Sequence, residues 1–149
     1  MQDQRQQGGD VVGGEGRLIG AMQRRKGARI EREAAKFLTG IGFPATRAAR
    51  NGVDGGEDIM CESLPGIRFE VKGNEAIDIG TQGLWTALVQ ASVPTGGKRG
   101  VVLWKHNRSK WRLTWADKMT GAIVTCGEKA IGDVLNVLNR EITERKDAR

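Results

Sequence analysis

The order of the helical and extended segments predicts an α/β protein in which a mixed central sheet is flanked by helices. Apolar residues recur at helical spacing near both ends of the chain, and the middle holds short runs of alternating apolar and polar residues. Glycines and prolines separate these runs, with 22 glycines in 149 residues. A chain of this length has room for one domain core.

The first predicted helix runs from about Met22 to Thr39. Its apolar stripe consists of Ile30, Ala34, Phe37, Leu38 and Ile41. Gly40, Gly42 and Pro44 then end it. Before this helix, residues 1–20 are rich in Gln and Gly and offer little apolar surface to bury, so we expect a flexible tail.

Extended segments follow, separated by glycine-containing turns. Three are expected at Phe43 to Ala49, Glu57 to Cys61 and Ile67 to Lys72. A second helix is expected from Thr81 to Ser92. The remaining strands are expected at Val101 to Lys105, Lys110 to Trp115 and Ala122 to Thr125, the first two forming a hairpin across His106 to Ser109.

The chain ends in an amphipathic helix with an apolar stripe at Ile131, Val134, Leu135, Leu138 and Ile142. We therefore divide the chain into the tail, a central domain at 21–127, and a C-terminal helix at 128–149. That helix packs on the domain or lies at a dimer interface.

The formal net charge of +6 favours an anionic partner such as nucleic acid. Two isolated cysteines are too few for a disulfide framework or a sulfur-ligated zinc site, so we expect reduced, buried thiols. No apolar run is long enough to cross a membrane, and no signal peptide is evident at the N-terminus. We expect a cytoplasmic protein without membrane contact, and nucleoid association or a viral origin stays open.

The segment Ile67 to Lys72 is the most informative for chemistry. Its alternation places Glu70 and Lys72 on one face of a strand. One strand earlier, Asp58 meets an apolar run, a position that strands disfavour for Asp. On the first helix, Glu31 and Glu33 flank the apolar stripe, and either could reach the sheet.

Three acids and a lysine at one sheet edge suit a Mg²⁺ site, because this ion prefers hard oxygen ligands and keeps several waters. Such an ion supports phosphodiester cleavage, and a lysine ammonium can position water or stabilise negative charge. The alternative interpretation is structural: Glu70 and Lys72 would form a solvated strand face and Asp58 a turn residue.

Asp58 followed by Glu70-Val71-Lys72 in an apolar strand resembles the pattern of the PD-(D/E)xK nuclease superfamily. The segments 26–33, 42–43 and 46–49 resemble the opening of archaeal-type Holliday junction resolvases within that superfamily. The resemblance covers about residues 25–115 and implies a restriction-endonuclease-like core. It departs from the family at the glycine-rich insertion 51–57.

The resemblance implies that Glu31, rather than Glu33, joins Asp58 and Glu70 as ligands of Mg²⁺, for which Mn²⁺ substitutes. The carbonyl of Val71 is a further ligand candidate, and Lys72 assists catalysis. Arg32 and Arg47 are implied to contact the phosphate backbone near the cut, and Arg50 is grouped with them.

Charge placement independently indicates nucleic-acid binding. A basic cluster precedes and enters the first helix, where positive charge opposes the helix dipole, at Arg25, Lys26, Arg29 and Arg32. The segment 98–112 holds no acid and adds Lys98, Arg99, Lys105, Arg108 and Lys110. The alternative interpretation of this segment is a solvated basic hairpin. We expect its tryptophans, Trp104 and Trp111, to be core anchors rather than base-stacking platforms.

The sequence thus leads to a Mg²⁺-dependent, structure-selective endonuclease that resolves four-way DNA junctions by paired nicks. Symmetric cutting by so small a chain requires two active sites, so we expect a homodimer. Two alternatives stay open: another PD-(D/E)xK nuclease acting on linear, flapped or nicked DNA, and a DNA-binding module of the same fold that does not cut.

Overall fold

The computed structural model describes residues 27–48, 58–73, 98–106, 108–117 and 119–147. Several predicted features lie outside these residues: the tail 1–20, the insertion 51–57 and the helix expected at Thr81 to Ser92. No helix within the described ranges combines the length and apolar character needed to cross a membrane.

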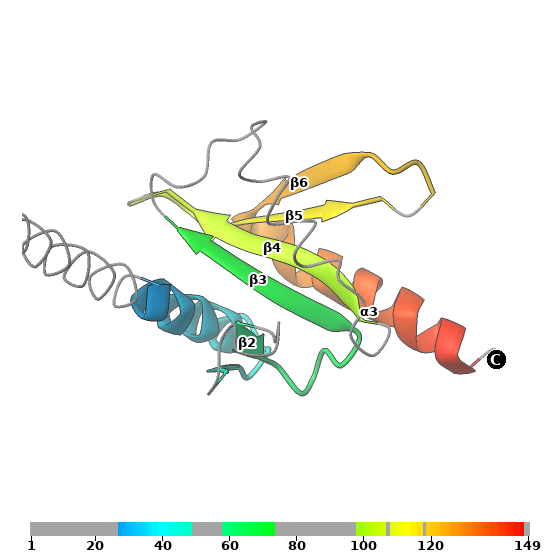
Figure 1. Ribbon diagram of the computed structural model, residues 1–149, viewed down its shortest axis with the longest axis horizontal. Coiled ribbons are helices and arrows are strands. Elements are labelled where there is room, and N and C mark those ends of the chain that lie inside the picture. Colours follow the sequence, from blue (N-terminus) through cyan, green and yellow to red (C-terminus); the bar gives the residue numbers. More distant parts are fainter. Residues whose placement is uncertain (1–26, 49–57, 74–97, 107, 118, 148–149) are drawn as a thin grey trace, which may run out of the picture.

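Six strands form a single sheet in the order β1-β2-β3-β4-β5-β6 (Figure 1). They are β1 (Thr46–Arg47), β2 (Ile59–Met60), β3 (Ile67–Gly73), β4 (Arg99–Lys105), β5 (Arg112–Ala116) and β6 (Ile123–Gly127). The central pair, β3 and β4, is parallel over seven residues, from Ile67 opposite Arg99 to Gly73 opposite Lys105. All other neighbours are antiparallel. The mixed sheet with its helices confirms the predicted α/β class.

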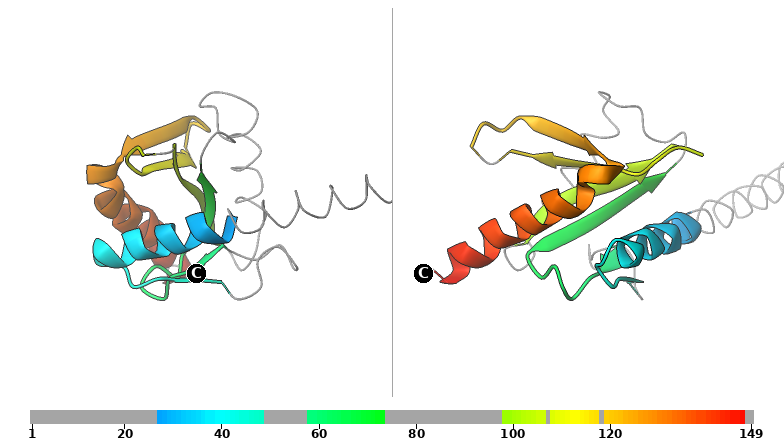
Figure 2. Two further views of the ribbon diagram at one scale, coloured as in Figure 1. Left: turned by 90° about the vertical axis from the view of Figure 1, so that its left-hand side faces the viewer. Right: turned by 180° about the vertical axis from the view of Figure 1, so that it is seen from behind.

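Two helices cover the same face of this sheet (Figure 2). One is the helix at residues 27–40; the other is α3 (Ile131–Asp147), preceded by the 3₁₀ turn η2 (Glu128–Ala130). Both contribute to one core with the inward side chains of β3 and β4, among them Ala34, Leu38, Phe69, Val71, Val101, Leu103, Leu135 and Leu138. Alternate strand residues and the apolar stripes of both helices pack against one another in this core, and their burial places the helices on this face of the sheet.

The opposite face of the sheet also buries large side chains. Trp104 is fully buried there, and its indole Nε1–H donates to Oγ1 of the buried Thr114 at 2.8 Å. Thr114 is also 2.8 Å from the hydroxyl of Thr125 on the edge strand β6. On the helix-covered face, Trp111 stacks on Phe37 with ring centroids 5.7 Å apart. Both tryptophans are therefore core anchors, as the sequence predicts.

The first helix ends where the sequence predicts. Gly42 has a φ of +103°, the left-handed conformation that glycine adopts without steric cost. The N–H of Phe43 donates to the carbonyl of Leu38 at 2.9 Å, which satisfies a carbonyl in the last turn. The chain therefore turns sharply toward β1.

β1 and β2 contain two residues each, fewer than the segments expected at Phe43 to Ala49 and Glu57 to Cys61. β2 pairs with β3 through Ile59 and Phe69. Beyond this pair, the Val71 N–H of β3 donates to the Asp58 side chain instead of to the backbone of a neighbouring strand. The later strands and α3 agree with the predicted segments to within a few residues. Cys61 and Cys126 form no disulfide within the described residues, and both are half-buried rather than buried as expected.

Candidate active site

Asp58 completes the hydrogen bonding of β3 beyond the end of β2. Its backbone N–H donates to the carbonyl of Phe69 at 3.2 Å, as a strand residue would. Its side-chain Oδ2 then accepts the next outward N–H, that of Val71, at 2.9 Å. Since the N–H and C=O of one strand residue point to the same side, the Val71 carbonyl faces this edge as well. The edge thus presents a carboxylate and a carbonyl side by side.

The environment of Asp58 raises its pKa to about 7 from an ordinary value of 3.8. Burial is the main cause, since it disfavours the charged form, and the negative charges of Glu70 and Glu31 act in the same direction. The Val71 N–H and the charge of Lys72 oppose the rise. A carboxyl placed in this way is stabilised in its ionised form by any additional cation.

Glu70 and Lys72 project from the same face of β3. Glu70 Oε1 lies 3.6 Å from Lys72 Nζ, and the Glu70 side chain is only 14% exposed. Burial raises the pKa of Glu70, whereas the charges of Lys72 and Arg68 lower it. Arg68, buried two residues before Glu70, was not singled out by the sequence reasoning, although the same alternation places it on this face.

The two acids of the first helix lie in different environments. Glu31 is near enough to Asp58 and Glu70 to raise the pKa of both, and its Oε2 accepts from Arg47 Nε at 2.6 Å. Glu33 instead lies 3.3 Å from Lys105 Nζ and pairs with Arg29. Helical spacing alone left these two acids equivalent, and the packing of the helix separates them.

Close packing at Gly73 brings Glu31 to the strand. A Cβ atom at position 73 would lie 2.6 Å from Cγ1 of Ile30, so only glycine lets the helix approach this closely. Ile30 directly precedes Glu31 in the chain. Sequence reasoning missed Gly73, although a glycine inside a strand pattern is a signal for close backbone approach.

The donors of this edge suit a hard divalent cation in chemistry, because they are carboxylates and a carbonyl in an environment that favours added positive charge. Within the described part of the chain, however, no three His, Cys, Asp or Glu side chains are gathered closely enough to hold a metal ion. The Glu31 carboxylate pairs with Arg47, and that of Asp58 with the Val71 N–H. The residues therefore fit the ion in type, while the carboxylates are held apart by their own partners.

The basic residues proposed to bind nucleic acid fall into separate groups. Lys105, Arg108 and Lys110 lie toward the end of β4 that adjoins Gly73. Lys98 and Arg99 lie at the other end of β4, and Arg99 is bound to Glu141 and to a backbone carbonyl. Arg29, Arg32 and Arg47 lie on the first helix and β1. Arg25, Lys26 and Arg50 lie outside the described residues.

Among solved structures, the chain is similar to Hjc from Archaeoglobus fulgidus, a Holliday junction resolvase from an archaeal hyperthermophile. The two share 23% sequence identity, and the match covers 72% of this chain and 98% of that chain with a TM-score of 0.46. No protein-family model matches this sequence, and no curated protein matches it. Function is therefore inferred from the residues of the site itself.

Proposed function

We propose that the protein is a Mg²⁺-dependent endodeoxyribonuclease that resolves four-way DNA junctions by paired nicks. The observation that carries the proposal is the juxtaposition at the edge of β3. Asp58, Glu70 and Glu31 act electrostatically on one another there, and Lys72 lies beside Glu70. A purely structural strand face does not explain why three partly buried acids lie within electrostatic reach of one another, an arrangement that carries an energetic cost.

Asp58, Glu70, Glu31 and the Val71 carbonyl would hold the ion in this proposal. When bound, Mg²⁺ lowers the pKa of a coordinated water and offsets charge on the scissile phosphate. The Val71 N–H keeps the Asp58 carboxylate oriented toward the edge. The Lys72 ammonium, 3.6 Å from Glu70, is placed to orient an attacking water or to stabilise charge that develops on the phosphate oxygens.

Recognition of DNA in this proposal depends on charge and shape. Arg108 and Lys110 are exposed in the β4–β5 turn, toward the strand end that carries the site. Arg32 is exposed on the first helix, one residue after Glu31. Contacts from such side chains to phosphates position a duplex without reading its bases, so a branched DNA would be selected by its geometry.

The proposal is tested with a labelled four-way junction and a linear duplex of matched sequence, each incubated with Mg²⁺ or with chelator. We expect cleavage of the junction that requires Mg²⁺ and is lost in Glu70→Gln and Lys72→Met. Glu62→Gln and Lys36→Met are matched controls, because both residues are exposed and neither belongs to the proposed site. Cleavage that ignores chelation, or survives both site substitutions, would exclude this centre.

The same experiment separates the alternatives. Equal cutting of the linear duplex would indicate another nuclease of the superfamily, and binding without cleavage would indicate a DNA-binding module. Paired symmetric nicks require two sites related by a two-fold axis. Light scattering of the active protein on its own should therefore give the mass of a homodimer.

A further inference from the structure

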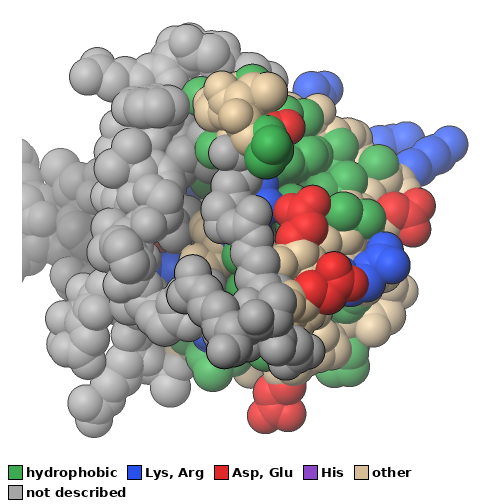
Figure 3. All heavy atoms as spheres, turned by 90° about the vertical axis from the view of Figure 1, so that its right-hand side faces the viewer, with side chains coloured by type: hydrophobic (Ala, Val, Ile, Leu, Met, Phe, Trp, Pro, Cys, Tyr) green, Lys and Arg blue, Asp and Glu red, His purple; other side chains and the backbone are tan. Residues whose placement is uncertain are grey.

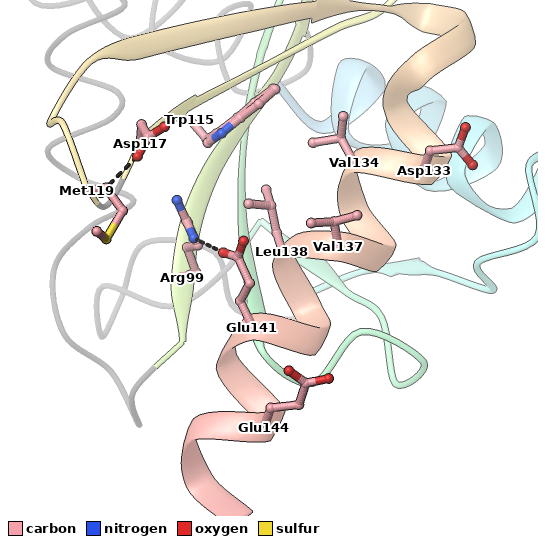
Figure 4. A pocket seen from close by; sticks show the side chains of 10 residues that line it. All are labelled: Arg99, Trp115, Asp117, Met119, Asp133, Val134, Val137, Leu138, Glu141 and Glu144. Carbon is pink, nitrogen blue, oxygen red and sulfur yellow. Dashed lines mark hydrogen bonds and ion pairs between the residues drawn. The ribbon is translucent and has the colours of Figure 1, made fainter. Parts of the chain in front are cut away.

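A groove separates α3 from the β5–β6 hairpin, with a cavity volume of about 640 Å³ (Figure 4). Trp115 lines it from the sheet, and Val134 and Leu138 line it from the helix. Val137 is also part of its lining and is 45% exposed. The volume lies within the range of pockets that accommodate side chains or small ligands.

The hairpin turn holds a large apolar side chain exposed beside this groove. Met119 is 88% exposed, the highest value among the large apolar residues described. The turn is nevertheless well hydrogen-bonded: Asp117 Oδ1 accepts from the N–H of Met119 at 2.8 Å, and Gly121 provides the required φ of +72°. Methionine adapts its shape to an apolar partner, so an ordered turn that exposes it suits a binding surface.

The groove is acidic although the chain as a whole is basic. Four carboxylates line it, those of Asp117, Asp133, Glu141 and Glu144. Within the described part of the chain Arg99 is the one basic residue of the lining. Its side chain is 11% exposed and donates to Glu141 Oε2 at 2.7 Å and to the Ala116 carbonyl at 2.8 Å. Viewed from this side, acidic and hydrophobic side chains adjoin one another on the described surface (Figure 3).

We propose that this groove binds a basic amphipathic helix of another protein. Apolar residues spaced one helical turn apart would enter between α3 and Met119. Lysines or arginines beside them would face the carboxylates of Asp117, Asp133 and Glu144, since Glu141 already pairs with Arg99. This charge pattern disfavours DNA, whose phosphates would be repelled. It also disfavours a second copy placed on a two-fold axis, because the same acidic rims would then face each other.

The groove and the candidate active site lie toward opposite ends of β4. Arg99, in the groove, begins the strand, and Lys105, opposite Gly73, ends it. Seven strand residues span about 20 Å. A partner helix can therefore occupy the groove while the other end of the sheet is in contact with a different ligand. The proposal does not depend on nuclease activity.

The test uses three fluorescein-labelled synthetic helical peptides of 14 residues and the full-length protein. The first carries leucines one turn apart with lysines beside them, the second has glutamates in place of those lysines, and the third is a scrambled form of the first. Fluorescence anisotropy should show saturable binding of the lysine peptide, weakened by salt, and at least about tenfold weaker binding of the other two.

Three variants assign that binding to the groove. The double substitution Met119→Ser, Val137→Ser should weaken binding of the lysine peptide about tenfold, because both side chains are exposed and would contact the leucines of the peptide. Asp133→Lys with Glu144→Lys should reverse the preference toward the glutamate peptide. Ile123→Ser is the matched control, since Ile123 has the same 45% exposure as Val137 but is not part of the groove lining.

Circular dichroism of each variant establishes that it is folded before binding is compared. Equal binding of all three peptides, or an unchanged affinity in both groove variants, would overturn the proposal. Dimerisation in sedimentation experiments that is lost in the Met119→Ser, Val137→Ser variant, together with no peptide binding, would identify a second copy as the occupant and would also overturn it.

Discussion

Gly73 lies directly against Ile30, so that a Cβ atom at position 73 would come within 2.6 Å of Ile30 Cγ1 and 2.8 Å of Ile30 Cδ1. Contacts this short force a neighbour to move. The neighbour here belongs to the helix that carries Glu31. The distance between helix and strand at this one glycine therefore sets the position of the third acid of the candidate site.

We expect Gly73→Ala to reduce cleavage at least about tenfold through displacement of Glu31, with a smaller change in the free energy of unfolding. Adding Ile30→Ala should restore cleavage, because it removes the side chain that the new methyl group meets. Single-turnover cleavage and urea denaturation of both variants check this. Equal losses in the single and double variants would show that the approach at Gly73 does not control Glu31.

Asp58 should make stability depend on pH. Its pKa of about 7 in the folded protein exceeds the ordinary 3.8, so between these values the folded state retains a proton that the unfolded chain has lost. The free energy of unfolding, relative to Asp58→Asn, should therefore fall by more than about 1 kcal/mol as the pH rises from 4 to 7. Asn can still accept the Val71 N–H.

Denaturation with urea in the presence of chelator, at a series of pH values, measures this difference. Above pH 7, added Mg²⁺ should stabilise the wild type more than Asp58→Asn, because the ionised carboxylate then gains a cation. A constant difference between the two proteins from pH 4 to 8 would contradict the prediction.

Arg47 should compete with a metal ion for Glu31. Its Nε lies 2.6 Å from Glu31 Oε2, and the ion pair must loosen before that carboxylate can serve a cation. Arg47→Met should bind Mg²⁺ about two- to fivefold more tightly in calorimetry without DNA, while it binds DNA less tightly. Arg32 is exposed and lies next to Glu31 on the first helix, so Arg32→Met is the control that should leave Mg²⁺ affinity unchanged. Weaker Mg²⁺ binding in Arg47→Met would show instead that Arg47 orients Glu31 for the metal.

The buried hydrogen bond between Trp104 and Thr114 should be important for stability. Thr114→Val would keep the shape of the side chain but leave the indole N–H without its acceptor, at a cost of about 1–3 kcal/mol in the free energy of unfolding. Thr125→Val removes a hydroxyl at an exposed position and leaves that bond in place. Chemical denaturation should show a smaller loss in the free energy of unfolding for Thr125→Val than for Thr114→Val. Equal losses would show that the hydrogen bond of the indole contributes little.

Periodicity was sufficient to predict the parts of the fold that depend on continuous apolar faces. β3, β4 and α3 lie where alternation or helical spacing places them, because each contributes a row of side chains to one core. β1 and β2 are shorter than their apolar segments suggest. At the end of β2 the Asp58 side chain bonds to Val71, a tertiary contact that local sequence does not encode.

The candidate site was predictable only in part. The alternation of β3 places Glu70 and Lys72 on one face, as the sequence indicates. The choice between Glu31 and Glu33 depends on how the helix docks at Gly73, a contact between residues far apart in the chain. The pairing of Glu31 with Arg47 arises in the same way and carries no local signal.

An uncovered strand edge is a template on which other chains can add strands and aggregate. Within the described residues, β2 covers β3 only near Phe69, and beyond it the Asp58 carboxylate takes the place of a neighbouring backbone at Val71. Because the Asp58 oxygen already accepts the Val71 N–H, that donor is not available to a foreign strand. The acid proposed to hold the metal ion would thus also prevent strand addition at this edge, so its replacement by alanine carries a risk of insolubility that replacement by asparagine avoids.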